Sequence, residues 1–135
     1  MTLVEVVIAL AITVLTIAGI VNGYIYCMAA TTKEGLYMAA NDRALERLEQ
    51  ARAAVWDTAS YPAVDQLVPA NFSNVVVNLD KNGTGSEVTT ATVITTIAPI
   101  SDTPPLRRIR VDCVWLFRGT EAVTNSIETC RAPDQ

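Results

Sequence analysis

One carboxylate in this sequence stands in surroundings that make it a candidate for chemistry: Glu5, within the run MTLVEVVIAL. No other residue from Thr2 to Val21 is charged, and Lys33 is the first Lys or Arg of the chain. A carboxylate among apolar side chains is strongly disfavoured unless a cation neutralises it or its side chain reaches a polar boundary. We therefore expect Glu5 to be paired with a cation. A chance polar residue that snorkels to a membrane surface is the alternative.

Other residue types that carry enzyme chemistry are sparse. The chain has no histidine, which excludes Ser-His and Cys-His nucleophiles and the ordinary zinc sites. The loop DKNGTGSE offers Asp80, Asn82 and Glu87 as oxygen ligands. Its glutamate is not at the twelfth position of a calcium loop, however, and a hairpin turn explains the loop better. With no paired-carboxylate signature either, we predict no enzymatic activity, no cofactor and no metal.

The three cysteines, Cys27, Cys113 and Cys130, match no CxxC pattern of a metal or redox site. A disulfide between Cys113 and Cys130 is the natural pairing if the C-terminal region lies outside the cytoplasm. If Val123 and Ile127 point inward, strand parity puts Cys130 on the face opposite to Cys113. The bond then needs a bulge, a slipped register or a frayed end. We retain this disulfide as the prediction.

The charge of the chain gives no sign of nucleic-acid binding. The formal net charge is −4 and there is no basic tract. Arg107, Arg108 and Arg110 form the one dense basic group, and a solvated strand end explains them better than a patch that binds a partner.

The element that must position Glu5 is a long N-terminal helix. At ~1.5 Å per residue its apolar run spans ~30 Å, the thickness of a bilayer's hydrocarbon layer. A removable signal peptide is the alternative, but it needs a positive segment before its apolar core, and none precedes this one. Gly19, Asn22 and Gly23 predict a kink or a melted segment, because each glycine costs ~1 kcal/mol relative to alanine. Close packing of helices is the other explanation for these glycines.

Helical character continues past the apolar run, without proline as far as Pro62. The stretch NDRALERLEQARAAVW is dense in strong helix formers. Charged residues three apart pair Arg43 with Glu46 and Glu49 with Arg52. An apolar stripe should pack this half of the helix on a folded domain, and it consists of Met38, Leu45, Leu48 and Val55.

Beyond residue 57 the sequence predicts a small antiparallel sheet. After a loop that contains Pro62 and Pro69, residues 73–80 and 87–98 form a hairpin around the turn KNGTGS. SDTPP cannot belong to a central strand, and RRIRVDCVWLF then alternates as a third strand, with VTNSIET as a short fourth. The inward face of the third strand is predicted to carry Ile109, Val111, Cys113, Trp115 and Phe117.

These patterns together define the fold class as α+β, with the second half of a long helix packed on a small antiparallel sheet. We expect an apolar transmembrane or filament-core helix over residues 1–25, its amphipathic continuation over 26–57, and a sheet domain over 58–135.

With Glu at the fifth position of an apolar helix that leads into an α+β domain, the chain resembles the type IV pilin and type II secretion pseudopilin family. The resemblance is carried by MTLVEVVIALAI, which is similar to the family's mature N-terminal signature: an apolar residue, Thr-Leu-Val/Ile, then Glu. By architecture it extends to about residue 57. Many pilins have a proline near position 22, where this chain has Asn22 followed by Gly23.

This resemblance implies a structural subunit of a type IV pilus-like or pseudopilus filament that assembles by helix bundling. It implies that a prepilin peptidase removes a basic leader, which leaves Met1 as the first residue of the mature chain, and that Met1 is N-methylated. Glu5 would pair with the α-amino group of Met1 on a neighbouring copy. That pair would satisfy two costly charges and fix one axial offset between helices.

The partners implied by the resemblance are copies of the same chain in a helical filament, the inner membrane before assembly, prepilin peptidase, and the pilus or secretion assembly machinery. The assembled location would be an extracellular pilus or a periplasmic pseudopilus. The composition of the helix is most similar to minor pseudopilin I and PilV-like proteins. A minor tip or membrane-tethered binding subunit of a type II secretion or DNA-uptake machine is the alternative function.

Overall fold

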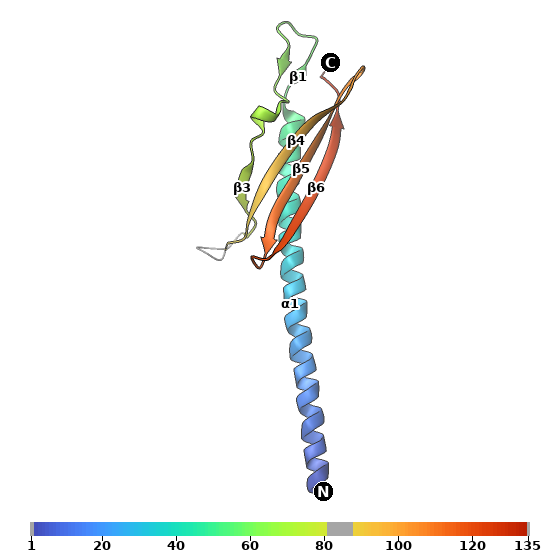
Figure 1. The fold of residues 1–135 in the computed structure, drawn as a ribbon, viewed down its shortest axis with the longest axis vertical. Coiled ribbons are helices and arrows are strands. Elements are labelled where there is room, and N and C mark those ends of the chain that lie inside the picture. The colour runs from blue at the N-terminus through green and yellow to red at the C-terminus, as the bar shows by residue number, and fades with distance from the viewer. Residues whose placement is uncertain (1, 81–87, 135) are drawn as a thin grey trace. The chain divides into compact units, whose positions relative to one another are not determined.

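The computed structural model describes residues 2–80 and 88–134 and has the predicted α+β layout (Figure 1). The chain divides into two compact units, Met1–Gly35 and Leu36–Gln135, and a single long helix, α1, contributes to both. The elements in chain order are α1 Leu3–Ala53, β1 Trp56–Asp57, β2 Val64–Asp65, the 3₁₀ helix η1 Pro69–Asn71, β3 Val75–Asn78, β4 Thr90–Asp102, β5 Pro105–Phe117 and β6 Glu121–Arg131.

The helix α1 runs without interruption through Gly19, Asn22 and Gly23, so the predicted melted segment is absent there. A Cβ added at Gly19 or Gly23 would meet no atom within 4 Å, so neither glycine makes room for another described part of the chain. The helix persists because opening it would free several backbone groups at once, and this costs more than the ~1 kcal/mol of each glycine.

In the second unit, four antiparallel strands form a sheet in the order β3-β4-β5-β6. Val75 pairs with Val93, which confirms the first hairpin, although its predicted turn KNGTGS lies outside the described residues. The prediction that SDTPP cannot belong to a central strand is wrong, because the interior strands β4 and β5 extend into it as far as the pair Asp102 and Pro105. The prolines are tolerated because they lie at the tight turn at the end of the hairpin. The fourth strand is also longer than predicted.

The helix ends at Ala53, so residues 54–57, predicted as its last turn, are not helical: Trp56–Asp57 form β1, which belongs to a second, two-stranded sheet with β2 from the predicted loop. Strands β1 and β2 pair Trp56 with Asp65, and η1 follows them. Side chains from this region, Trp56, Leu67 and Phe72, are buried in the same core as α1 and the four-stranded sheet. They close the end of the core that the helix alone would leave open.

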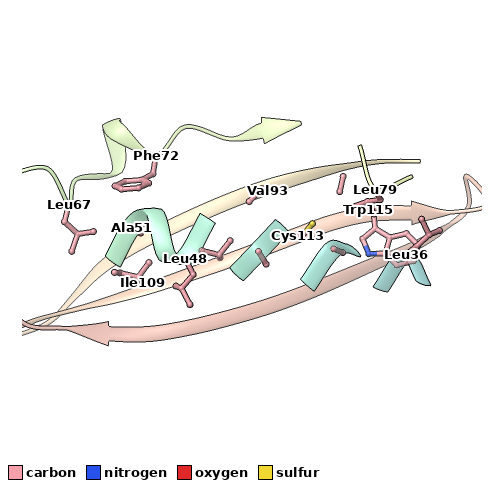
Figure 2. Packing of buried hydrophobic residues seen from close by; sticks show 14 of the residues in the cluster. Leu36, Leu48, Ala51, Leu67, Phe72, Leu79, Val93, Ile109, Cys113 and Trp115 are labelled. Carbon is pink, nitrogen blue, oxygen red and sulfur yellow. The ribbon is translucent and has the colours of Figure 1, made fainter. Parts of the chain in front are cut away.

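The face of α1 that packs on the sheet differs from the predicted stripe (Figure 2). Met38, Leu45 and Val55 are exposed, and of the predicted stripe Leu48 alone is buried. The buried line is instead Leu36, Ala40, Ala44, Leu48 and Ala51. Alanines dominate because the sheet supplies the bulk, so small side chains on α1 allow close approach of helix and sheet.

The inward face of β5 is as predicted. Ile109, Val111, Cys113 and Trp115 are buried, and Phe117 is half-buried, with its ring perpendicular to that of Trp115 at 6.2 Å between centroids. Across the β5–β6 turn, Arg118 and Gly119 adopt φ values of 51° and 72°. Residues 118–120 therefore form a tight turn between the two strands.

Candidate functional site

The most unusual surface of the protein is the apolar part of α1 in the first unit. Its large apolar side chains are exposed, and Leu3, Leu10, Leu15 and Ile20 each have at least 60% of their surface accessible. A helix this long and apolar is able to cross a membrane. Water is an unfavourable solvent for such a surface, and lipid or other helices would be more favourable surroundings.

The threonine side chains within α1 are bonded to the helix itself. The hydroxyls of Thr13 and Thr16 donate to the carbonyl oxygens of Ala9 and Ile12, at 2.8 and 2.6 Å. Thr31 does the same toward the carbonyl of Cys27, at 2.9 Å. These bonds remove the cost of placing hydroxyl groups in an apolar medium, so the threonines are compatible with a membrane or a helix bundle.

The end of the apolar segment carries aromatic and charged residues. Tyr24 and Tyr26 are exposed, at 65% and 77% of their surface, and Lys33 and Glu34 follow two turns later. Tyrosine is enriched at membrane–water interfaces, because its ring suits the apolar side and its hydroxyl the polar side. This order of residues fits a membrane boundary near Tyr24.

Glu5 lies in the first turn of α1, on the exposed apolar segment. Its Oε2 accepts a hydrogen bond from the backbone N–H of Thr2 at 3.3 Å, and its own N–H donates to the carbonyl of Thr2 at 3.1 Å. The first of these bonds, from the Thr2 N–H to the Glu5 side chain, is one of the two bonds of a capping box. Thr2-x-x-Glu5 is the sequence signal for this box, and the sequence-based prediction missed it. Met1, the predicted partner and methylation site, lies outside the described residues.

The predicted disulfide is not formed, since Cys27, Cys113 and Cys130 are all free in the described structure. Across β5 and β6, Cys113 is opposite Asn125 and Cys130 is opposite Arg108. The two cysteines therefore lie on opposite faces and five residue pairs apart along the hairpin. Cys113 is fully buried and burial raises the pKa of its thiol, whereas Cys130 is exposed.

The arginines of the dense basic group on β5 make different contacts. The Arg107 guanidinium makes two bonds to the Asp65 carboxylate, at 2.9 and 2.7 Å, a third to the carbonyl of Leu67 at 2.7 Å, and stacks 4.3 Å from the Trp56 ring. These bonds from Arg107 hold the pKa of Asp65 below its usual range. Arg110 pairs with Asp112 at 2.9 Å along the same strand. The expected solvated strand end thus holds for Arg108 and Arg110, which are exposed, whereas Arg107 is partly buried in structural contacts.

The C-terminal end of α1 is held by residues from the end of the chain, which no local pattern in the sequence indicates. Arg131 donates to the carbonyl oxygens of Ala51 and Ala54, and to the Asp134 carboxylate at 2.7 Å. Asp134 also accepts a bond from the backbone N–H of Trp56 at 2.8 Å, and this bond and Arg131 lower its pKa. Carbonyls left open at the end of α1 are satisfied in this way.

Of the candidate oxygen ligands in the loop DKNGTGSE, the structure describes Asp80. No group of three potential metal ligands occurs among the described residues. Asp80 accepts a bond from the backbone N–H of Thr89 at 2.8 Å and so closes the first hairpin, while Asn82 and Glu87 lie outside the description. An open hollow of about 530 Å³ is lined by threonines, apolar side chains and Arg118.

Comparison of the chain with protein-family models, with curated protein sequences and with solved structures finds no match.

Proposed function

We propose that this chain is a structural subunit of a filament of the type IV pilin or pseudopilin kind. The observation that carries the proposal is the exposed apolar segment of α1 with a carboxylate in its first turn. Before assembly, this segment would anchor the subunit in the inner membrane. In the assembled filament, the same segment would lie among its copies in a parallel bundle, with the sheet domains outside.

Packing, rather than transfer out of water, would drive this assembly. Lipid chains are as apolar as the side chains of the segment, so moving the helix from membrane to bundle gains little hydrophobic free energy. Van der Waals contact between helices and the pairing of polar groups then decide stability. A single charged residue therefore has a large influence on which arrangement forms.

Glu5 would supply that influence. One carboxylate oxygen accepts the Thr2 bond, which leaves Oε1 for the α-amino group of Met1 on a neighbouring copy. A salt bridge in an apolar bundle tolerates little displacement, because either charge alone is costly there. The pair would thus select one axial offset between otherwise uniform helices.

Substitutions at Glu5 separate this role from helix capping. Glu5→Gln keeps an oxygen that can accept the Thr2 bond but removes the charge, whereas Glu5→Ala removes both. We expect both variants to insert in the membrane and to lose incorporation into filaments, as measured by electron microscopy and immunoblotting of sheared cell surfaces and periplasmic fractions. Glu34→Gln removes a charge from the same helix outside the apolar run, and it should assemble normally.

Three outcomes decide between the hypotheses. Normal assembly of Glu5→Gln with failure of Glu5→Ala would reduce Glu5 to a cap. Normal assembly of both variants would overturn the proposal for Glu5. Wild-type chain at trace stoichiometry in filaments would favour the alternative of a minor tip subunit. Mass spectrometry of the native chain tests processing independently, since the proposal requires a methylated Met1.

A further inference from the structure

The two edges of the four-stranded sheet differ in how they are protected. Among the described strands, β3 and β6 stand at the ends of the order. Strand β6 is 11 residues long and pairs with β5 without a register shift. It contains neither proline nor lysine, two residues with which proteins commonly block sheet edges. Its outer backbone groups thus form a long template for another strand.

The direction in which the edge strands run determines how a second copy must be oriented to pair with β6. Each neighbour in the order β3-β4-β5-β6 is antiparallel, so β3 and β6 run in opposite directions. Two copies in the same orientation therefore present antiparallel edges to each other. An antiparallel pair of two β6 strands would instead reverse the second unit of one copy relative to that of the other, whereas the subunits of the proposed filament share one orientation.

The edge of β3 opens on a groove beside α1. Two adjoining hollows, of about 210 and 470 Å³, share Arg43 and Glu46 of the helix and extend along β3 and the residues after it, from Val75 to Asp80. Val75, Val77 and Val93 line the first hollow. An incoming strand with inward apolar side chains would find space and apolar contact there. In β6 the residues of that kind are Val123 and Ile127, both half-buried in their own copy.

We propose that β6 of one copy pairs antiparallel with β3 of the next copy, which extends the sheet from one head domain to its neighbour. The inference rests on the parallel subunits of the proposed filament, and copies in one membrane have the same orientation. Because the two edges differ, the contact is heterologous and propagates instead of closing as a dimer. With four residues in β3, the ladder is short and weak alone. Bundled helices supply the high local concentration that makes it form.

Cysteine cross-linking in the full-length chain tests this pairing. The background carries Cys27→Ser and Cys130→Ser, which leaves the buried Cys113. Val76→Cys on the outer side of β3 is combined in turn with Ala122→Cys, Thr124→Cys or Glu128→Cys on the same side of β6, all exposed positions. Within one chain, β3 and β6 are ~14 Å apart, which is too far for a disulfide, so every bond formed joins two copies.

Mild oxidation of cells should convert at least one of the three double variants into a ladder of dimers, trimers and larger species, with at least a tenfold excess over each single-cysteine variant. Val76→Cys with Leu116→Cys is the matched control, because Leu116 is exposed on the same face but lies in the interior strand β5. This control should give no ladder.

The outcomes separate the edge pairing from the filament itself. Filaments that contain the double variants without any β3–β6 cross-link would overturn the pairing and leave the filament proposal standing. Dimers from Thr124→Cys alone would also overturn it, since they indicate contact of two β6 strands. Ladders in membranes without filaments would support the pairing and contradict the filament. Loss of both ladders and filaments in double variants that reach wild-type levels in the membrane would contradict both.

Discussion

The guanidinium of Arg131, in the last strand, donates a hydrogen bond to the carbonyl oxygen of Ala51, 80 residues earlier in the last turn of α1, at 3.1 Å. A second bond from the same nitrogen reaches the carbonyl of Ala54. The charge lies at the negative end of the helix, where a cation is favoured. Arg131 therefore joins β6 to the helix on which the sheet packs.

Replacing this arginine should destabilise the second unit. Arg131→Ala leaves part-buried carbonyls without a donor, which costs ~1–3 kcal/mol. We expect a loss of this size in the free energy of unfolding, measured by denaturant titration of the full-length chain in detergent and followed by tryptophan fluorescence. Arg52→Ala is the control, since Arg52 is in the same turn of α1 but makes an exposed pair with Glu49. Its cost should be a few tenths of a kcal/mol. Equal costs for the two variants would contradict the capping role.

The position of the core on α1 gives a second prediction. Leu48 is 4% exposed and packs in the core, while Leu45, one turn earlier, is 46% exposed. Leu48→Ala should reduce the free energy of unfolding by ~2–5 kcal/mol, because it creates a cavity between helix and sheet. Leu45→Ala should cost well under 1 kcal/mol in the same denaturant titration. A larger loss of unfolding free energy for Leu45→Ala than for Leu48→Ala would instead support the apolar stripe that the spacing of large apolar residues predicts.

This difference indicates why the sequence predicted the sheet better than the helix face. In β5 the alternation of Ile109, Val111, Cys113 and Trp115 has the period of a strand and few other interpretations. On α1, two faces carry apolar residues and either could pack on the sheet. Ranking the faces by the hydrophobicity of their side chains favours leucine, whereas close packing of helix and sheet requires the alanines. The ion pairs Arg43–Glu46 and Arg52–Glu49, by contrast, follow from spacing alone and are present at 2.9 Å.

Contacts between distant segments were the part that the sequence did not reveal. The Arg131 bonds to α1 and the clamp of Arg107 on Asp65 join residues 40 to 80 positions apart, and no local pattern encodes them. For the cysteines, the alternation of side chains along the strands predicted that Cys113 and Cys130 lie on opposite faces of the sheet. A location outside the cytoplasm favoured a disulfide between them instead. The observed register places them on opposite faces. For Glu5, the capping signal Thr2-x-x-Glu5 was present in the sequence and overlooked.

The Arg107–Asp65 clamp makes stability dependent on pH in the acidic range. Hydrogen bonds from Arg107 lower the pKa of Asp65 in the folded chain below its ordinary value of 3.8. A carboxyl with a depressed folded pKa stabilises the protein above its unfolded pKa, and this contribution is lost as the pH falls through the folded value. We therefore expect the free energy of unfolding to decrease as the pH is lowered below about 4.

Asp65→Asn should flatten this acidic dependence, with a loss at neutral pH of about 1 kcal/mol or less, since the pair is partly exposed. Denaturant titrations of the full-length chain between about pH 2 and 6 measure both effects.

Arg107→Ala should flatten the pH dependence over the same range, and the double variant should lose little more stability than either single variant, because both substitutions remove the same interaction. The pKa values of Asp57 and Asp134 are also lowered, by backbone N–H bonds first, so some acid dependence remains in every variant. An Asp65→Asn profile parallel to that of the wild type would show that the clamp does not control the pKa of Asp65.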